Sequence, residues 1–329
     1  MAGVEQIKVA DGETGMRLDR WFKSHFPGLS FGHLQKLLRS GQVRIDGGRA
    51  KSDTRIEPGQ MIRVPPLGVD KKGEGPVTTR TMRGQGDAEV LSQMLIYEDP
   101  KVYVFDKPAG LAVQGGSGIT RHLDDMLEAW RNAKGEKPRL VHRLDRDTAG
   151  VLLVARTRSA AAFLGEAFKK RETRKIYWAI VAGVPRPADG RISTFLAREE
   201  EWERMRVAKH GEEGADHAVT LYALADQAGQ KASFLVMRPI TGRTHQLRAH
   251  AAHIGHPILG DPKYFDIENW ELPGGLQNRL HLLARRIVIP HPDGGTLDVT
   301  APLPPHMQQS WAVLGFEERT GDEAAEALT

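Results

Sequence analysis

Five charged or titratable side chains stand between two apolar runs in LVHRLDRDTAGVLLVAR, residues 140 to 156: His142, Arg143, Asp145, Arg146 and Asp147. Charged residues between two strands usually form a solvated turn. Asp145 also fits a second interpretation, in which its carboxylate does chemistry. Arginines flank it closely on both sides, and neighbouring cations keep a carboxylate ionised, as a nucleophile must be. The turn Asp-Thr-Ala-Gly that follows would present Asp145 at the mouth of a sheet.

A second polar stretch, MRPITGRTHQLRAHAAHIGHPILGDPKYF, covers residues 237 to 265. Thr241-Gly242 is expected to end a strand, and a helix is expected to begin at Arg243. Arg243 and Arg248 are candidates for function there, because a guanidinium can pair with a carboxylate or hold a phosphate.

Four histidines of the same stretch would lie within about 140° of one another on an ideal helix, which makes a metal site one interpretation: His245, His250, His253 and His256. Their spacing does not match the i, i+4 pair of a zinc-protease helix. Gly255 and Pro257 would also end the helix before His256 completes the face. We therefore favour capping, packing or hydrogen bonding for these histidines, and we expect no metal.

The segment RKIYWAIVAG, residues 174 to 183, reads as a strand with two adjacent aromatics, Tyr177 and Trp178. Aromatics in an apolar strand are most often core residues. Neighbouring strand residues point to opposite faces of a sheet, so at most one of the two lines a given cleft.

The elements that must position these residues divide the chain into parts. At the N-terminal end, Leu18, Trp21 and Phe22 have helical spacing. A second helix is predicted from its cap Ser30 to Gly41, and a hairpin with Gly47-Gly48 at its turn follows. We expect two helices and a small sheet here, which together form a compact module over residues 14–66.

Residues 67–90 are rich in glycine and charge without periodicity, and we interpret them as a linker. Helical patterns beyond them, one of them capped by Ser159, are interspersed among many strands with no regular βαβ repeat. That order favours an α+β domain over 91–316, with a mixed sheet rather than a doubly wound one. The acidic residues 317–329 are interpreted as a frayed tail.

The positive charge of the chain is concentrated near its N-terminus. Between Met16 and Pro65, ten Lys and Arg residues stand against four Asp and Glu residues, whereas the whole chain carries a net charge of only +4. Lys36, Arg39 and Arg44 cluster where the second helix meets the hairpin. Such a patch is typical of proteins that bind a phosphate backbone, and a solvated face without a partner is the alternative.

Composition excludes several classes of protein. The chain has no Cys, which rules out disulfides, thiolate catalysis and Cys-ligated zinc. No apolar run approaches the length of a membrane span, and the first residues lack the apolar core of a secretion signal. A soluble cytoplasmic protein without a membrane partner is therefore expected.

Several motifs together resemble one family. HRLDRDTAGVLLVA is similar to the signature of the RluA-type pseudouridine synthases, and GRTHQLRAHAAHIGHPILGD and YEDPKVYVFDKPAGLAV resemble its flanking motifs in order and spacing. The resemblance runs from about Leu95 to Pro305, and AVQGGSG is closest to the RluC branch. It implies a mixed, largely antiparallel central sheet flanked by helices. The N-terminal module resembles the small RNA-binding domain first named for ribosomal protein S-four.

The resemblance implies isomerisation of uridine to pseudouridine in large-subunit ribosomal RNA, without a cofactor. Asp145 would act on the flipped-out nucleotide as nucleophile or base, Arg243 would pair with it, and Tyr177 would stack on the base. Arg143 would fill the gap that the uridine leaves in the stack. Further contacts to RNA are expected from four basic residues: Arg248, Lys36, Arg39 and Arg44.

The chain departs from the family pattern at two places. Asp106 stands where the family often has Asn before Lys-Pro, and Leu283 stands where a late His is usual.

Two other functions remain as alternatives: a non-catalytic RNA-binding protein of ribosome assembly, and a metal-dependent hydrolase built on the histidines. The RNA could be met within pre-ribosomal particles, and no obligate protein partner is expected.

Overall fold

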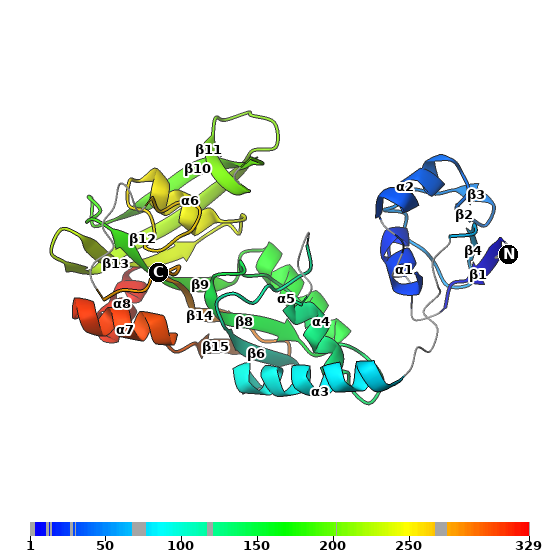
Figure 1. Cartoon of the computed structure of the whole chain (residues 1–329), viewed down its shortest axis with the longest axis horizontal. Helices are drawn as coiled ribbons and strands as arrows, with labels where there is room; N and C mark the ends of the chain where they lie inside the picture. Colours follow the sequence, from blue (N-terminus) through cyan, green and yellow to red (C-terminus); the bar gives the residue numbers. More distant parts are fainter. Residues whose placement is uncertain are drawn as a thin grey trace. The chain divides into compact units, whose positions relative to one another are not determined.

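The computed structural model describes residues 4–10, 13, 15–26, 29, 31–67, 77–116, 121–201, 203–266 and 275–328. The predicted helix cap Ser30 lies outside these residues. The chain divides into two compact units, Met1–Thr81 and Met82–Thr329, which are described separately below (Figure 1).

The first unit is an antiparallel sheet with two helices, and its strands follow the order β1-β4-β2-β3. Its elements are β1 (Glu5–Lys8), α1 (Leu18–His25), α2 (Phe31–Arg39), β2 (Arg44–Ile45), β3 (Gly48–Arg49) and β4 (Met61–Val64). Leu18, Trp21 and Phe22 of α1 are buried in its core, as their helical spacing predicts.

The hairpin of the first unit turns one residue earlier than predicted. Ile45 pairs with Gly48, so the turn consists of Asp46 and Gly47, and both have positive φ. A two-residue turn of this type needs left-handed backbone at both positions, which aspartate followed by glycine supplies. The predicted stop of the preceding helix is confirmed, since Gly41 has a φ of 70°.

The second unit contains an 11-stranded sheet in the order β11-β10-β12-β13-β9-β14-β8-β6-β5, with β15 beside β14 and β7 beside β8. Its strands are β5 (Leu95–Glu98), β6 (Val102–Lys107), β7 (Arg139–Leu140), β8 (Ala149–Ala155), β9 (Arg174–Ala182), β10 (Asp189–Glu199), β11 (Arg204–Ala208), β12 (Asp216–Ala228), β13 (Ala232–Pro239), β14 (Leu282–Pro290) and β15 (Thr296–Thr300). The pairing of β8 with β14 is parallel and the other strand pairs found in the described ranges are antiparallel. The predicted α+β fold with a largely antiparallel sheet is confirmed.

Helices cover both faces of this sheet (Figure 1). They are α3 (Val77–Met94), α4 (Leu123–Met126) with the 3₁₀ turn η2 (Leu127–Trp130), α5 (Arg158–Lys169), α6 (Gln246–His253), α7 (Pro305–Leu314) and α8 (Glu318–Ala327). In β9, Trp178 and Ile180 join the core formed with α5, α7 and α8. Tyr177 and Ala179 face the other side, where α6 packs. Tyr177 and Trp178 therefore point to opposite faces, as predicted.

Two helix boundaries differ from the sequence interpretation. Helix α3 occupies much of the segment interpreted as a linker, and its last turns bury Leu91 and Met94. Helix α5 begins earlier than predicted, because the hydroxyl of Thr157, not Ser159, accepts the capping hydrogen bond from the amide of Ala160 at 3.1 Å. Both differences arise because packing and capping partners extend a helix beyond the residues whose apolar periodicity predicts it.

The acidic C-terminal segment is not a frayed tail but helix α8. It packs closely on the sheet because Gly321 leaves room for Phe234 and Trp178, which a Cβ at this position would strike. Ala325 and Leu328 are buried in the core. A stripe of small and apolar residues among many acids is enough to dock a helix.

None of the helices in the described part of the chain combines the length and the apolar character that a membrane span requires.

Candidate active site

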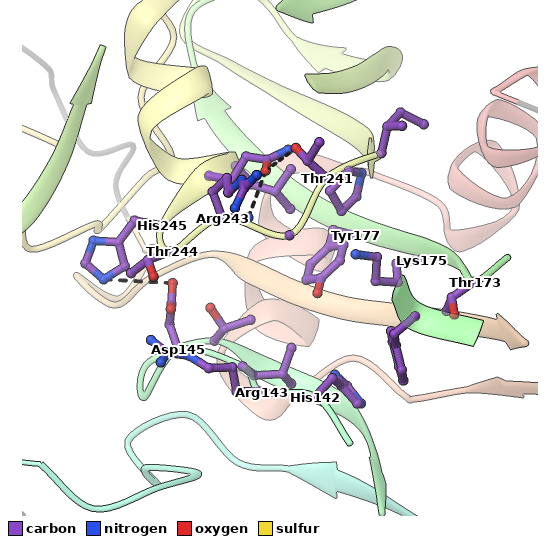
Figure 2. Close-up of a pocket in the computed structure, with 18 of the residues that line it drawn as sticks. His142, Arg143, Asp145, Thr173, Lys175, Tyr177, Thr241, Arg243, Thr244 and His245 are labelled. Carbon is purple, nitrogen blue, oxygen red and sulfur yellow. Dashed lines mark hydrogen bonds and ion pairs between the residues drawn. The ribbon is translucent and has the colours of Figure 1, made fainter. Parts of the chain in front are cut away.

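A pocket of about 580 Å³ in the second unit collects residues from three segments of the chain and Leu282 from a fourth. Asp145 and Arg143 come from the loop between β7 and β8, Tyr177 comes from β9, and Arg243 comes from the loop that precedes α6 (Figure 2). These are the three catalytic residues that the family resemblance implies, Asp145, Tyr177 and Arg243, together with Arg143, which is expected to fill the gap left by the uridine. We therefore take this pocket as the candidate active site.

A buried lysine, Lys107, fixes the loop that carries Asp145. The ammonium of Lys107 donates hydrogen bonds to the carbonyl oxygens of Pro108 (2.9 Å), Leu111 (2.9 Å) and Arg146 (3.0 Å). Burial lowers the pKa of Lys107 to about 8, and nearby carboxylates act in the opposite direction. A buried cation surrounded by carbonyl oxygens fixes the backbone that supplies them.

The Asp-Thr-Ala-Gly turn lets the following strand approach its neighbour. Gly150 has a φ of 107°, and a Cβ there would strike the carbonyl of Ala284 on β14. Glycine is the residue that allows both this conformation and this close contact. The turn that follows Asp145 therefore connects the loop directly to the centre of the sheet.

Replacing Lys107 with methionine is expected to lower the midpoint of thermal unfolding by roughly 5–10 °C, since buried carbonyl oxygens lose their donor. The matched control is Lys101→Met, because Lys101 makes only a partly exposed ion pair with Asp293 at 3.3 Å. Such pairs contribute little, so the control should unfold close to the wild-type temperature. Equal midpoints for the two variants, measured by circular dichroism, would contradict the role of Lys107.

The cation beside Asp145 is Arg248, and the predicted pairing with Arg243 is not formed. The guanidinium of Arg248 lies 3.7 Å from Oδ2 of Asp145. Arg243 instead pairs with Asp216 at 3.1 Å and donates to the carbonyl of His217 at 3.2 Å. Arg243 lies in the exposed part of the loop between β13 and α6, which is why its side chain reaches outward, whereas Arg248 lies inside α6.

Arg248 is itself held by a second carboxylate. Its guanidinium donates to both oxygens of Asp261, at 2.7 and 2.6 Å, and both side chains are almost completely buried. A two-pronged pair of this kind fixes the plane of the guanidinium. The edge of Arg248 that faces Asp145 is therefore positioned before any substrate binds.

His245 is a second neighbour of Asp145, although capping, packing or hydrogen bonding is the role expected for it from the sequence. Its Nε2 lies 3.9 Å from Oδ2 of Asp145, as the dashed line in Figure 2 marks. Burial lowers the pKa of His245, while the charge of Asp145 acts in the opposite direction. Its φ of 49° is left-handed, a strained conformation that often marks functional positions.

A buried hydrogen-bond network holds the loop between β13 and α6. The side-chain oxygen of Gln246 accepts from the hydroxyl of Thr241 at 2.6 Å and from the amide of Arg243 at 3.0 Å. The side-chain amide of Gln246 donates to the carbonyl of Val219 at 2.8 Å. The helix begins at Gln246, not at the predicted Arg243, because these contacts keep the preceding residues in a loop.

Tyr177 supplies the protonated hydroxyl of the pocket. Burial raises the pKa of Tyr177 far above its usual value, and the negative charge of Asp145 adds to this effect. Its phenol therefore stays neutral at physiological pH and can donate a hydrogen bond to a bound base. Arg143 lines the same pocket and is exposed, so it is free to contact RNA.

Two of the remaining histidines of the second polar stretch, His250 and His256, have hydrogen-bonding roles, and His253 is exposed. The ring of His250 bonds to the hydroxyls of Thr194 and Thr220, at 3.0 and 2.8 Å. His256 donates to the carbonyl of Ala182 at 2.7 Å. The described residues contain no group of three metal-ligating side chains.

The two residues that depart from the family motifs are buried to different extents. Leu283, at the position of the usual late histidine, is fully buried in the core of the sheet. Asp106 stands beside Lys107 on β6, and burial raises the pKa of Asp106 to about 6. Neither residue is among those that line the candidate active site.

Comparisons with known proteins agree with this geometry. Residues 101–253 match the RNA pseudouridylate synthase family. The chain is 34% identical over 319 residues to ribosomal large subunit pseudouridine synthase C of Haemophilus ducreyi, which covers 96% of this chain and 98% of that protein. The protein of the same name from Escherichia coli K12 is 32% identical over 305 residues, with 91% and 93% covered.

A solved structure gives the same result. Human RNA pseudouridylate synthase domain containing 4 superposes with a TM-score of 0.61 at 28% identity, and the match covers 72% of this chain and 98% of the human chain. The match with the Haemophilus protein extends over nearly the full length of both chains. This chain therefore belongs to the RNA pseudouridylate synthase family, whose members are isomerases that convert uridine in RNA to pseudouridine.

Proposed function

We propose that this protein converts specific uridines of large-subunit ribosomal RNA to pseudouridine, with Asp145 as the reacting carboxylate. The observation that supports this most directly is the pocket in which Asp145, Tyr177 and Arg248 converge. The relatives that match almost the whole chain are named for the large ribosomal subunit. Their substrate is proposed here for this chain as well.

The reaction breaks the bond between nitrogen 1 of uracil and carbon 1′ of ribose, turns the base, and joins carbon 5 to carbon 1′. Nitrogen 1 gains a proton and carbon 5 loses one, so atoms balance without a cofactor. The reacting bonds are inaccessible in a stacked base, so the uridine must first leave the helix. Arg143 would fill the place that it leaves.

The pocket residues have distinct roles in this proposal. Asp145 attacks the nucleotide or removes a proton from it. Arg248 and His245 keep Asp145 in place through the contacts described above. Tyr177 presents a neutral phenol to the detached base, which can stack on its ring and accept a hydrogen bond from its hydroxyl.

The loss of hydrogen from carbon 5 supplies the test. A large-subunit ribosomal RNA transcript with tritium at carbon 5 of uridine should release tritium to water when it is incubated with the full-length protein. Chelator should not slow the release. A transfer RNA transcript labelled in the same way is the comparison, and preferential release from transfer RNA would contradict the proposed substrate.

The N-terminal unit is proposed to hold the RNA through its positive charge. Lys36 and Arg39 lie in the last turn of α2, and Arg44 begins β2 close by in the chain. We call these three exposed residues the α2 basic patch. We propose that residues 14–66 act as an S-four-type RNA-binding domain.

Neutralising the α2 basic patch with Lys36→Gln, Arg39→Gln and Arg44→Gln is expected to weaken RNA binding. The slope of log affinity against log salt should decrease by about 2, since each lost phosphate contact removes about 0.7–0.9. Binding is measured by filter retention at several salt concentrations. Equal slopes for this variant and the wild type would show that the patch is a solvated face.

The matched control neutralises three exposed basic residues of the second unit that lie outside the pocket: Lys134, Arg139 and Arg319. Its salt slope should stay close to that of the wild type.

We further propose that the protein acts in the cytoplasm, on ribosomal RNA that can already be part of a pre-ribosomal particle, and without an obligate protein partner.

A further inference from the structure

The candidate active site extends beyond the residues that the reaction requires. In Figure 2 the labelled side chains follow in the order Asp145, Tyr177, Lys175 and Thr173, away from the reacting carboxylate. All four line the same pocket. The part of the pocket beside Lys175 and Thr173, which we call the distal end, has no role in the mechanism described above.

The strand explains why these side chains form a row. Tyr177 and Lys175 lie two residues apart on β9, and Thr173 directly precedes this strand. Alternate strand residues share a face, and their Cα atoms are about 6.7 Å apart. A group bound at Lys175 would therefore lie beside the base that stacks on Tyr177.

Two polar groups of the distal end, on Lys175 and Thr173, have no partner in the described part of the chain. Among the residues that the structure describes, the ammonium of Lys175 makes no hydrogen bond or ion pair. The hydroxyl oxygen of Thr173 is buried and has no hydrogen-bond partner either. Burial lowers the pKa of Lys175 to about 8, and no carboxylate acts in the opposite direction.

Basic side chains outnumber acidic ones in the lining of the pocket. Its lining includes six basic residues, Arg143, Lys169, Arg171, Lys175, Arg243 and Arg248, against the single acid Asp145. Arg248 and Arg243 have carboxylate partners in Asp261 and Asp216. Lys175 has no such partner among the described residues, and an unpaired cation that is partly withdrawn from water costs free energy that the fold must supply from elsewhere. Such a cost points to a ligand that completes the site.

We propose that Lys175 and Thr173 form a subsite for one phosphodiester of the RNA strand, next to the flipped uridine. An ammonium and a hydroxyl are both donors, and the non-bridging oxygens of a phosphate are strong acceptors. Lys169 and Arg171, exposed at the same pocket, would guide the strand toward the subsite. This inference rests on the proposed function only in that the substrate is RNA.

The first test is the binding of a short fluorescent oligouridylate to the full-length protein, measured by anisotropy at several salt concentrations. Lys175→Met is expected to weaken binding by about 10- to 100-fold at low salt, as for a lost hydrogen bond to a charged group. The salt slope should fall by about 0.7. Lys175→Arg should recover most of the affinity. Unchanged affinity and slope for Lys175→Met would overturn the proposal.

Lys134→Met is the matched control, because Lys134 is exposed and lies outside the pocket. Its affinity for the oligouridylate should equal that of the wild type. Thermal unfolding separates binding from a structural role of Lys175. Removal of an unpaired, partly buried charge should leave the unfolding midpoint unchanged or raise it. A midpoint several degrees lower would show that Lys175 supports the fold, and would overturn the proposal.

A phosphate scan identifies what Lys175 contacts. Each phosphate of the oligouridylate is replaced in turn by an uncharged methylphosphonate. One replacement should weaken binding to the wild type and have little effect on Lys175→Met, because both changes remove the same contact. If the losses from Lys175→Met and from the methylphosphonate add at every position, Lys175 contacts no phosphate. That result would overturn the proposal and would indicate a contact of Lys175 with the base.

These measurements do not depend on which RNA the enzyme modifies. If large-subunit ribosomal RNA fails to release tritium, the proposed substrate is wrong, yet the phosphate scan can still identify the subsite. If tritium is released and the scan shows only additive losses, the subsite is wrong and the proposed function stands.

Discussion

Replacing Asp145 with asparagine is expected to lower tritium release from large-subunit ribosomal RNA by at least about 10³-fold, because an amide can act neither as nucleophile nor as base. The substitution keeps the shape of the side chain, so RNA should still bind with nearly wild-type affinity. Filter binding and tritium release, measured on the same protein sample, separate the two effects.

Asp147→Asn is the matched control two residues away. Asp147 lines no part of the pocket, and its carboxylate pairs with the exposed Arg146 at 3.2 Å. Such a surface pair contributes little, so this variant should keep nearly full activity. Asp145 would lose its assigned role if Asp145→Asn retained a substantial part of the wild-type turnover, or if both variants were equally impaired.

The residues that the structure brings together in the candidate active site could be predicted because each stands in a long local motif. Asp145 and Arg143 are adjacent to the strand that positions them, and the alternation of β9 alone separates Tyr177 from Trp178. The pattern of strands and helices likewise predicted an α+β fold. The order of the strands could not be predicted, since β9 lies between β13 and β14 and all three are far apart in the chain.

The partner of Asp145 could not be predicted from the sequence. Arg243 and Arg248 lie in the same motif, and choosing between them requires the direction of each side chain. That direction depends on Asp261, at the far end of the motif, and on Asp216, which lies outside it; each pairs with one arginine. The same reason applies to His245, whose strained backbone has no signature in the residue types. Contacts between distant segments decide these positions.

Replacing Arg248 with methionine is expected to impair both folding and catalysis. Asp261 is almost completely buried, and without Arg248 its carboxylate would lack a cation. Breaking a buried ion pair in this way costs about 3–5 kcal/mol, which lowers the unfolding midpoint by roughly 6–20 °C in a domain of this size. Tritium release should fall as well, by about 10- to 100-fold for a lost charged contact to Asp145.

A second variant separates the two losses. Adding Asp261→Leu to Arg248→Met replaces the buried ion pair with apolar side chains, which is often neutral or stabilising. The double variant should therefore recover most of the unfolding midpoint, measured by calorimetry. Its tritium release should stay low, because Asp145 still lacks the guanidinium that lies 3.7 Å away in the wild type. Recovery of activity together with stability would mean that Arg248 serves the fold alone, and that His245 suffices to position Asp145.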